Sequence, residues 1–306
     1  MGPLNKKESK KELIYFKVDA GRYFDKKDFL SWINKRVTKT ISYFDMFEYN
    51  SRILIAVNGD VRSVVLLYLL SKIEKKFPRA KMAIAYIDEG ISGYSDRKLS
   101  IVKKLATKFD LPLHVVRFKD SFGFTVDTLA NHYENVCEIC KILKRWLLND
   151  LAYKIGYDRI ALGRTLEDVA FEILMYFVRN KLNALLIYPF TPERLHKKLV
   201  PIVKPLMFLK KKEIILFAHL QNLPFSTSIC PYFLKSMEKQ ILQEMYRLEE
   251  KYPGMLFGLL NFAQSFFVNT KEKPILRECK ICGYPSSDTL CEAHQLLEHI
   301  RTLMQY

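Results

Sequence analysis

The cysteines of this sequence are the side chains most able to do chemistry, and the densest group of them lies near the C-terminus. The stretch CKICGYPSSDTLCEAH has the spacing C-x2-C-x8-C-x2-H and contains Cys279, Cys282, Cys291 and His294. Three thiolates and one imidazole at such short spacing are an ordinary ligand set for structural zinc. We therefore predict a zinc site here. His299 could replace His294 as the fourth ligand, but its spacing is worse.

A second group of cysteines is split between two distant parts of the chain. Cys137 and Cys140 form a C-x2-C pair at the expected start of a helix, where N–H groups and the helix dipole stabilise thiolates, and Cys230 stands alone before a proline. Three cysteines are one short of a tetrahedral set. Two interpretations stay open: a redox pair with a bystander, or an iron–sulfur cluster with one iron not bound by cysteine. Lys144 lies one turn beyond Cys140 and could reach the same site, or it could be a solvated lysine.

The stretch AVNGDVRSVVLLYLL predicts the end of a buried strand, a short loop and an apolar helix. Many α/β proteins hold a phosphate at such a place. Here, however, the loop contains Asp60 and Arg62, which a phosphate-binding loop would not obviously want. The stretch could be a nucleotide site, a ruined one, or merely a turn.

A second strand–loop–helix unit, ALGRTLEDVAFEIL, places Glu167 and Asp168 in the first turn of its helix. Acidic residues are favoured at a helix start by the helix dipole, which explains Glu167 well without any chemistry. That explanation is less strong for the pair with Asp168, and both residues lie at the carboxyl end of a strand, where ligands bind in such sheets.

These groups need a scaffold, and the sequence predicts one. From Arg52 onward strands and helices alternate, which predicts an α/β fold with a parallel sheet and helices on both faces. The expected strands are 52–57, 81–88, 112–118 and 158–163, and the expected helices are 25–44, 63–77, 95–109, 140–156, 166–182, 210–222, 234–252 and 253–267. We divide the chain into an N-terminal extension (1–50), a catalytic domain (51–270) and a C-terminal zinc module (271–306).

The composition narrows the class of protein. The chain has 306 residues, 49 Lys plus Arg against 33 Asp plus Glu, and a formal net charge of +16. Such an excess favours a polyanionic partner, although a basic solvated surface would also produce it. No uninterrupted apolar stretch reaches membrane-spanning length, and we expect the polar start, MGPLNKKESKKELIYFK, to be a solvated tail rather than a secretory signal. We therefore expect a cytoplasmic protein whose cysteines serve metal or redox chemistry.

Taken together, the three groups resemble the PP-loop tRNA 2-thiolation enzymes of the TtuA/TtcA type, over roughly residues 50–300. The C-terminal cysteine group is similar to the zinc module of that family, which usually ends in C-x-x-C where this chain has CEAH. The stretches that carry the resemblance are IDEGISGYSDRKLSIVKKLATKFDLPLHVV, CEICKILKRWLLNDLAYKIGYDRIALG and VPIVKPLMFLKKKEIILFAHLQNLPFSTSICPY.

The resemblance implies a Rossmann-like ATP-pyrophosphatase domain that uses ATP and Mg²⁺ to adenylate the C2 oxygen of a tRNA uridine, after which sulfur displaces AMP. It also implies that Cys137, Cys140 and Cys230 hold a [4Fe–4S] cluster whose free iron presents the sulfur. Lys144 and Asp168 fall where the family has its catalytic lysine and acid. The nucleotide-binding residues that the resemblance implies are Asn58, Gly59, Ser63 and Gly163.

The chain departs from the family in its loop. The family has S-G-G-x-D-S, whereas this chain has NGDVRS, with Asn58, Asp60 and Arg62 as the replacements. Asp60 puts a negative charge where backbone should approach phosphate, and Arg62 removes an acid that would help to place a metal. Arg62 could contact phosphate directly, or it could pair with Asp60 and close the site. The later G-H-N motif reads GRT, and no cysteine precedes Cys137, so the N-terminal zinc module of the family is absent.

Two functional hypotheses follow. In the first, the chain is a tRNA sulfurtransferase whose altered loop still binds ATP. In the second, it is a divergent relative that lost ATP use, and it moves sulfur without adenylation or acts as a non-catalytic tRNA-binding subunit. The complete cysteine set favours an enzyme, and the loop favours the second hypothesis. The expected partners are tRNA, a sulfur donor (sulfide or a ubiquitin-like carrier) and, by resemblance, a second copy in a homodimer, with no membrane.

Overall fold

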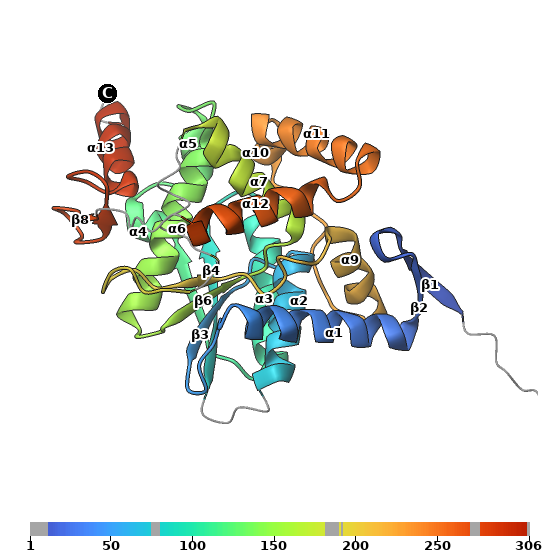
Figure 1. Cartoon of the computed structure of the whole chain (residues 1–306). Helices are drawn as coiled ribbons and strands as arrows, with labels where there is room; N and C mark the ends of the chain where they lie inside the picture. Colours follow the sequence, from blue (N-terminus) through green and yellow to red (C-terminus); the bar gives the residue numbers. More distant parts are fainter. Residues whose placement is uncertain (1–11, 75–79, 181–189, 191, 270–275, 305–306) are drawn as a thin grey trace, which may run out of the picture.

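The computed structural model describes residues 12–74, 80–180, 190, 192–269 and 276–304. Within these ranges the centre of the molecule is a sheet of five parallel strands in the order β5-β4-β3-β6-β7 (Figure 1). The strands are β3 (Arg52–Ala56), β4 (Lys81–Asp88), β5 (Leu113–Arg117), β6 (Arg159–Leu162) and β7 (Ile202–Val203). The predicted fold class, a parallel α/β sheet, is confirmed.

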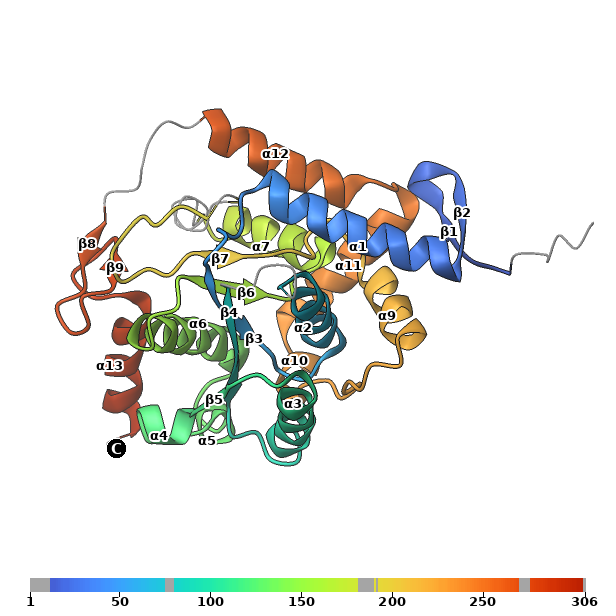
Figure 2. The same cartoon turned by 90° about the horizontal axis from the view of Figure 1, so that it is seen from below.

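Different helices cover the two faces of the sheet. The helices concerned are α2 (Val61–Glu74), α3 (Ser95–Phe109), α6 (Val136–Lys154) and α7 (Leu166–Val178). Ile53 and Ile55 of β3 pack into one core with α2, α3 and α7, whereas Leu54 packs into another with α6. This alternation follows from the two-residue period of a strand. Figure 2 shows α6 on one side of the sheet and α2 and α3 on the other.

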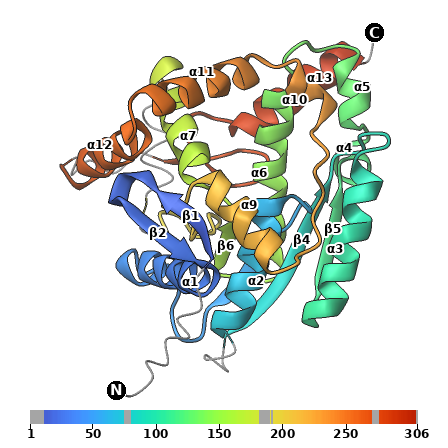
Figure 3. The ribbon, with the colours of Figure 1, turned by 90° about the vertical axis from the view of Figure 1, so that its right-hand side faces the viewer.

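The N-terminal part of the described chain packs onto the same core. It consists of β1 (Leu13–Lys17), the 3-10 helix η1 (Val18–Ala20), β2 (Arg22–Asp25) and α1 (Lys26–Tyr43). Asp25 begins α1 as its N-cap, accepting a hydrogen bond from the Asp28 backbone N–H at 2.8 Å. Phe29, Ile33 and Val37, spaced by four residues on one helix face, are fully buried in the core of the sheet. Figure 3 shows the β1–β2 hairpin beside α1 and α9.

The remaining elements pack around the sheet and its covering helices. They are α4 (Phe118–Phe122), α5 (Val126–Ala130), α9 (Lys211–Leu220), α10 (Pro231–Leu234), α11 (Met237–Lys251), α12 (Met255–Asn269), β8 (Arg277–Glu278), β9 (Pro285–Ser286) and α13 (Glu292–Met304). The α12 helix packs on α7, and α13 packs on α6. The C-terminal cysteine group is thereby attached to the helix that also carries Cys137 and Cys140.

Most of the expected elements are present, with informative shifts. The helix expected from residue 140 begins at Val136, so that Cys137 and Cys140 lie inside its first two turns. The helix expected from residue 63 begins at Val61, directly after Asp60. The short fifth strand β7, the hairpin of β1 and β2 and the final helix α13 were not predicted. Residues 1–11 of the expected tail and the ends of two expected helices (75–77 and 181–182) lie outside the described residues.

Candidate functional site at the carboxyl edge of the sheet

The C-terminal cysteine group has the geometry of a metal site. The ligand atoms of Cys279, Cys282, Cys291 and His294 all lie within 4.8 Å of one another. The Cys282 and Cys291 sulfurs are 3.8 Å apart, and the Cys291 sulfur is 3.2 Å from His294 Nδ1. Two sulfurs on a tetrahedral zinc, each at about 2.3 Å, would be separated by about 3.8 Å. The four side chains therefore fit zinc. The alternative ligand His299 instead faces the ring of Tyr133.

The three other cysteines converge from two elements. Cys137 and Cys140 lie in the first turns of α6, and Cys230 is the N-cap of α10, whose first residue is Pro231. The three sulfurs are close enough to influence one another electrostatically, and α10 packs against α6. The Tyr232 hydroxyl donates a hydrogen bond to Asp127 Oδ1 at 2.7 Å, which fastens α10 to α5.

Burial dominates the titration of these thiols. Removal from water raises the pKa of Cys137 to about 11 and that of Cys140 to about 12, and the neighbouring Cys230 adds to both shifts. At these two positions desolvation outweighs the helix dipole that the sequence suggested would stabilise thiolates. Three soft sulfur donors in a partly apolar pocket are the kind of ligand that an iron–sulfur cluster would take.

Lys144 lies one turn beyond Cys140 and is not a solvated lysine. Its ammonium forms an ion pair with the buried Glu89, which follows strand β4. Burial alone would lower the pKa of Lys144, but the charges of Glu89 and Cys140 raise it well above its usual value. Lys144 therefore carries a fixed positive charge beside the cysteines.

A second lysine extends this charged cluster toward the loop after β3. Lys98 of α3 is 3% exposed and donates a hydrogen bond to the Tyr94 hydroxyl at 2.6 Å. Burial lowers the pKa of Lys98, partly offset by Asp60 and Glu89. Sequence reasoning missed Lys98, Tyr94 and Glu89. For Glu89 the signal was its place at a strand's carboxyl end; for Lys98 the sequence carried no such signal.

The loop after β3 satisfies its own polar groups. Asp60 caps helix α2, since its Oδ1 accepts the Ser63 backbone N–H at 2.8 Å. The Asn58 side-chain oxygen accepts the Asp60 backbone N–H at 3.1 Å and the Ser63 hydroxyl at 2.9 Å. Gly59 has a φ of +76°, the left-handed region that favours glycine. Two of the four residues expected to bind nucleotide, Asn58 and Ser63, are therefore hydrogen-bonded to each other.

Arg62 joins this loop to the start of α7. Its guanidinium is 2.6 Å from Asp60 Oδ2 and 2.5 Å from Asp168 Oδ1. Asp168 Oδ2 accepts the Thr165 backbone N–H at 2.9 Å and the Thr165 hydroxyl at 3.2 Å. Of the two roles considered for Arg62, the structure shows the pairing with Asp60, and it adds Asp168 as a second partner. In this arrangement Arg62 engages one carboxylate oxygen of Asp60 and one of Asp168.

Gly163 allows the two loops to meet. A Cβ atom at this position would lie 2.8 Å from the Arg62 carbonyl carbon and oxygen and 2.9 Å from the Ser63 nitrogen. Only a residue without a side chain permits this approach. Gly163 is thus required by the contact between the β6–α7 loop and the β3–α2 loop, beside Arg62 and Asp168.

Glu167 has a structural role at this edge. Its carboxylate accepts the Lys211 backbone N–H at 2.9 and 3.0 Å, at the start of helix α9. Burial raises the pKa of Glu167. Glu167 is therefore more than an acid at the start of α7, because its side chain also binds the N-terminus of a second helix, α9.

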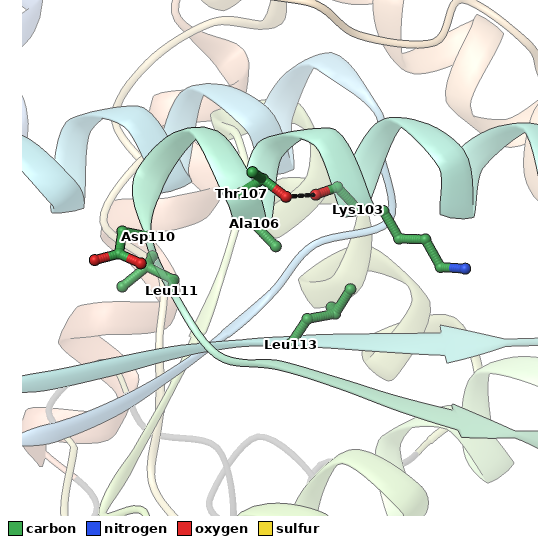
Figure 4. A pocket seen from close by; sticks show the side chains of 6 residues that line it. All are labelled: Lys103, Ala106, Thr107, Asp110, Leu111 and Leu113. Carbon is green, nitrogen blue, oxygen red and sulfur yellow. Dashed lines mark hydrogen bonds between the residues drawn. The ribbon is translucent and has the colours of Figure 1, made fainter.

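A surface pocket between the end of α3 and the start of β5 lies away from all of these groups. It is lined by Lys103, Ala106, Thr107, Asp110, Leu111 and Leu113 (Figure 4). The C-terminal end of α3 and the start of β5 lie at the amino edge of the sheet, opposite the edge where ligands bind in parallel α/β folds. The Thr107 hydroxyl already donates to the Lys103 carbonyl oxygen at 3.3 Å.

None of the helices in the described ranges combines the length and the apolar character needed to cross a lipid bilayer.

Comparison with known proteins identifies relatives of this chain. The family model of the PP-loop domain matches residues 31–228. The chain is 34% identical to the tRNA-5-methyluridine(54) 2-sulfurtransferase of Thermotoga maritima, over 90% of this chain and 90% of that protein. It is 30% identical to a probable sulfurtransferase of Methanocaldococcus jannaschii, over 92% of this chain and 84% of that protein.

A solved structure shares the fold over almost the whole chain. The U34-tRNA thiolase NcsA from Methanococcus maripaludis, determined with its [4Fe-4S] cluster, superposes with a TM-score of 0.80 at 25% sequence identity, covering 96% of this chain and 95% of that one. The parallel sheet and these relatives agree with the resemblance seen in the sequence. The chain belongs to the PP-loop family of tRNA 2-thiolation enzymes.

Proposed function

We propose that this chain is a sulfurtransferase that thiolates C2 of a uridine in tRNA. The observation that carries the proposal is the convergence of Cys137, Cys140 and Cys230 beside the Lys144–Glu89 ion pair, from segments about ninety residues apart in the sequence. Supporting it, the named relatives of comparable length are tRNA 2-sulfurtransferases, and NcsA carries a [4Fe-4S] cluster.

The two cysteine groups have different roles in this proposal. Cys137, Cys140 and Cys230 would hold a [4Fe–4S] cluster, which supplies an iron free to bind an exogenous sulfur as a soft ligand. The C-terminal group would hold zinc and serve structure only, because all four positions of a tetrahedral ion are filled by protein side chains.

The charged residues near the cysteines act on the substrate. Lys144, held positive by Glu89, stabilises negative charge on the tRNA base or on a leaving group. Asp168 has both carboxylate oxygens engaged, one by Arg62 and one by Thr165. A role for Asp168 as metal ligand or proton acceptor requires Arg62 to leave. We therefore propose that Asp168 positions Arg62.

The partners follow from charge and from the relatives. The formal charge of +16 supports tRNA as the polyanionic partner. We also propose that this chain receives its sulfur from sulfide or from a ubiquitin-like carrier, and that it forms a homodimer. Relatives from Chlamydomonas reinhardtii and Danio rerio are named cytoplasmic tRNA 2-thiolation proteins, which supports a cytoplasmic location.

The test is made in the cell that produces the protein. The gene is deleted, and tRNA nucleosides are measured by liquid chromatography and mass spectrometry. We expect one 2-thiolated uridine to disappear, to return with the unaltered gene, and to stay absent with Cys230→Ser. Ser228→Ala, an exposed neighbour in the same loop, is the matched control and should restore it.

Other outcomes separate the alternatives. If Cys230→Ser fully restored the 2-thiolated uridine, sulfur transfer would not depend on this cysteine. The chain would then be a non-catalytic tRNA-binding subunit. A disulfide between Cys137 and Cys140 in protein purified without oxygen and reconstituted with iron would replace the cluster by a redox pair.

A further inference from the structure

We infer that Asp60, Arg62 and Asp168 form a built-in ion triad that closes the nucleotide loop, so that this chain takes up no magnesium-bound ATP there. The inference deepens the proposed function, on which its consequence for the reaction rests: an ATP-dependent activation of the uridine oxygen does not use this loop.

The start of helix α2 is where a phosphate would bind in a loop of this kind. The N–H groups at the start of a helix bind phosphate because they are unpaired and positively polarised. At the start of α2 the Ser63 N–H is already bonded to the Asp60 carboxylate at 2.8 Å. Burial alone would raise the pKa of Asp60, but Arg62 and the Ser63 N–H lower it well below its usual range. A phosphate would therefore meet a permanent negative charge and a missing donor.

The space between the Asp60 and Asp168 carboxylates is where a magnesium ion would bind. Magnesium requires oxygen ligands in near-ideal octahedral geometry. The Arg62 guanidinium bonds one oxygen each of Asp60 and Asp168, at 2.6 and 2.5 Å, and the second Asp168 oxygen is bonded to Thr165. Arginine stays charged at any physiological pH. The position between the two carboxylates thus already has a cation that belongs to the protein.

The ion triad is mostly buried and rests on a constrained backbone. The side chains of Arg62, Asp60 and Asp168 are only 26%, 18% and 15% exposed, so solvent and salt screen their attraction less than on an open surface. The backbone beneath them is fixed as well: Gly163 lies directly against the Arg62 backbone, and the Gly59 carbonyl oxygen accepts the Ser226 N–H at 2.8 Å.

The consequence for the reaction can be written out. The uridine O2 must first become a better leaving group, which an ATP-dependent adenylyl transfer achieves by forming an O–P bond and releasing pyrophosphate. A sulfur nucleophile then forms the C2–S bond, and the C2–O bond breaks as AMP leaves with the electron pair. The triad removes the first step from this loop and leaves the second, which uses no ATP, to the site formed by the cysteines and Lys144.

The test compares two loops by calorimetric titration with magnesium-bound ATP. The unaltered chain should show no saturable binding, that is, a Kd weaker than about 1 mM. The double variant Asp60→Gly with Arg62→Asp, which gives the loop NGGVDS, should bind at least about tenfold more tightly, a gain of about 1.4 kcal/mol. Glu244→Gly with Arg247→Asp makes the same change of charge at an exposed ion pair and should change nothing.

Each other result has a definite meaning. Saturable binding by the unaltered chain overturns the inference, and so does release of pyrophosphate from ATP and tRNA by that chain alone. A folded double variant that fails to bind shows that the triad is not what excludes ATP, and also overturns it. If the double variant does not fold, the measurements on the unaltered chain still decide. Loss of the proposed function would appear separately, as unchanged 2-thiouridine after gene deletion.

Discussion

Replacing Gly163 by alanine tests the close approach of the two loops at the carboxyl edge. The added Cβ would lie 2.8 Å from the backbone of Arg62, which is 0.6 Å short of the 3.4 Å at which ordinary contact begins. The atoms in the way are backbone atoms and cannot turn aside as a flexible side chain would. Overpacking a tight site costs typically about 1–3 kcal/mol, and we expect the upper half of that range.

The assay is thermal and urea unfolding of the purified protein. A loss of about 2–3 kcal/mol should lower the Tm by roughly 3–5 °C for a chain of this size. Gly258→Ala is the matched control: it lies within helix α12, and a Cβ there would meet nothing within 4 Å. It should leave stability unchanged or raise it by about 0.5–1 kcal/mol, since alanine favours helix over glycine.

One result would refute the reasoning. If Gly163→Ala unfolds at the same temperature as the unaltered protein, the β3–α2 and β6–α7 loops are not in the close contact described. A loss of stability with retained pairing of Arg62 would instead show that strain was absorbed elsewhere along the β6–α7 loop.

Three further predictions concern the metal, the nucleic acid and pH. Isolated protein should contain about one zinc per chain beside its iron, and Cys279→Ser with Cys282→Ser should remove the zinc; metal analysis finding it retained would contradict the site. Binding of tRNA, followed by fluorescence anisotropy, should weaken steeply between low and moderate salt, and an affinity independent of salt would contradict a phosphate-dominated contact. Burial alone would raise the pKa of Glu172, but Lys204 and Arg164 lower it to about 2, so its stabilisation is present above the unfolded pKa near 4.5 and is lost as pH falls toward 2. Glu172→Gln should therefore cost up to roughly 3 kcal/mol at pH 7, with the difference from the unaltered protein shrinking below about pH 4.5 in urea unfolding.

The fold was largely readable from the sequence because its strands are buried on both faces and its helices are strongly patterned. RILIA and KMAIAYID became β3 and β4 with little change of boundary. By contrast, β7 has only two residues, and no periodicity can be detected in so short a strand. Its place at the sheet edge is decided by pairing with β6, a contact distant in sequence.

The candidate site was predictable in composition but not in pairing. Spacing identified the four side chains that meet at the C-terminal metal site, since residues close in sequence are close in space. Asp60 was anticipated as a partner of Arg62. Glu89 as the partner of Lys144 and Asp168 as the second partner of Arg62 were not, because they lie 55 and 106 residues away. Which side chains meet across a sheet edge depends on loop conformation, and single residues such as Gly163 decide it.

The hydrogen bond from the Ser226 N–H to the Gly59 carbonyl oxygen has a consequence beyond the stability of the loop. Ser226 lies only four residues before Cys230, and Pro231 stiffens the chain directly after that cysteine. The segment that carries Cys230 is thus tied to the loop after β3. A movement of Gly59 that keeps this hydrogen bond would carry Ser226 with it and strain the short segment up to Cys230. If the three cysteines hold the proposed cluster, its visible absorbance would report the conformation of that loop.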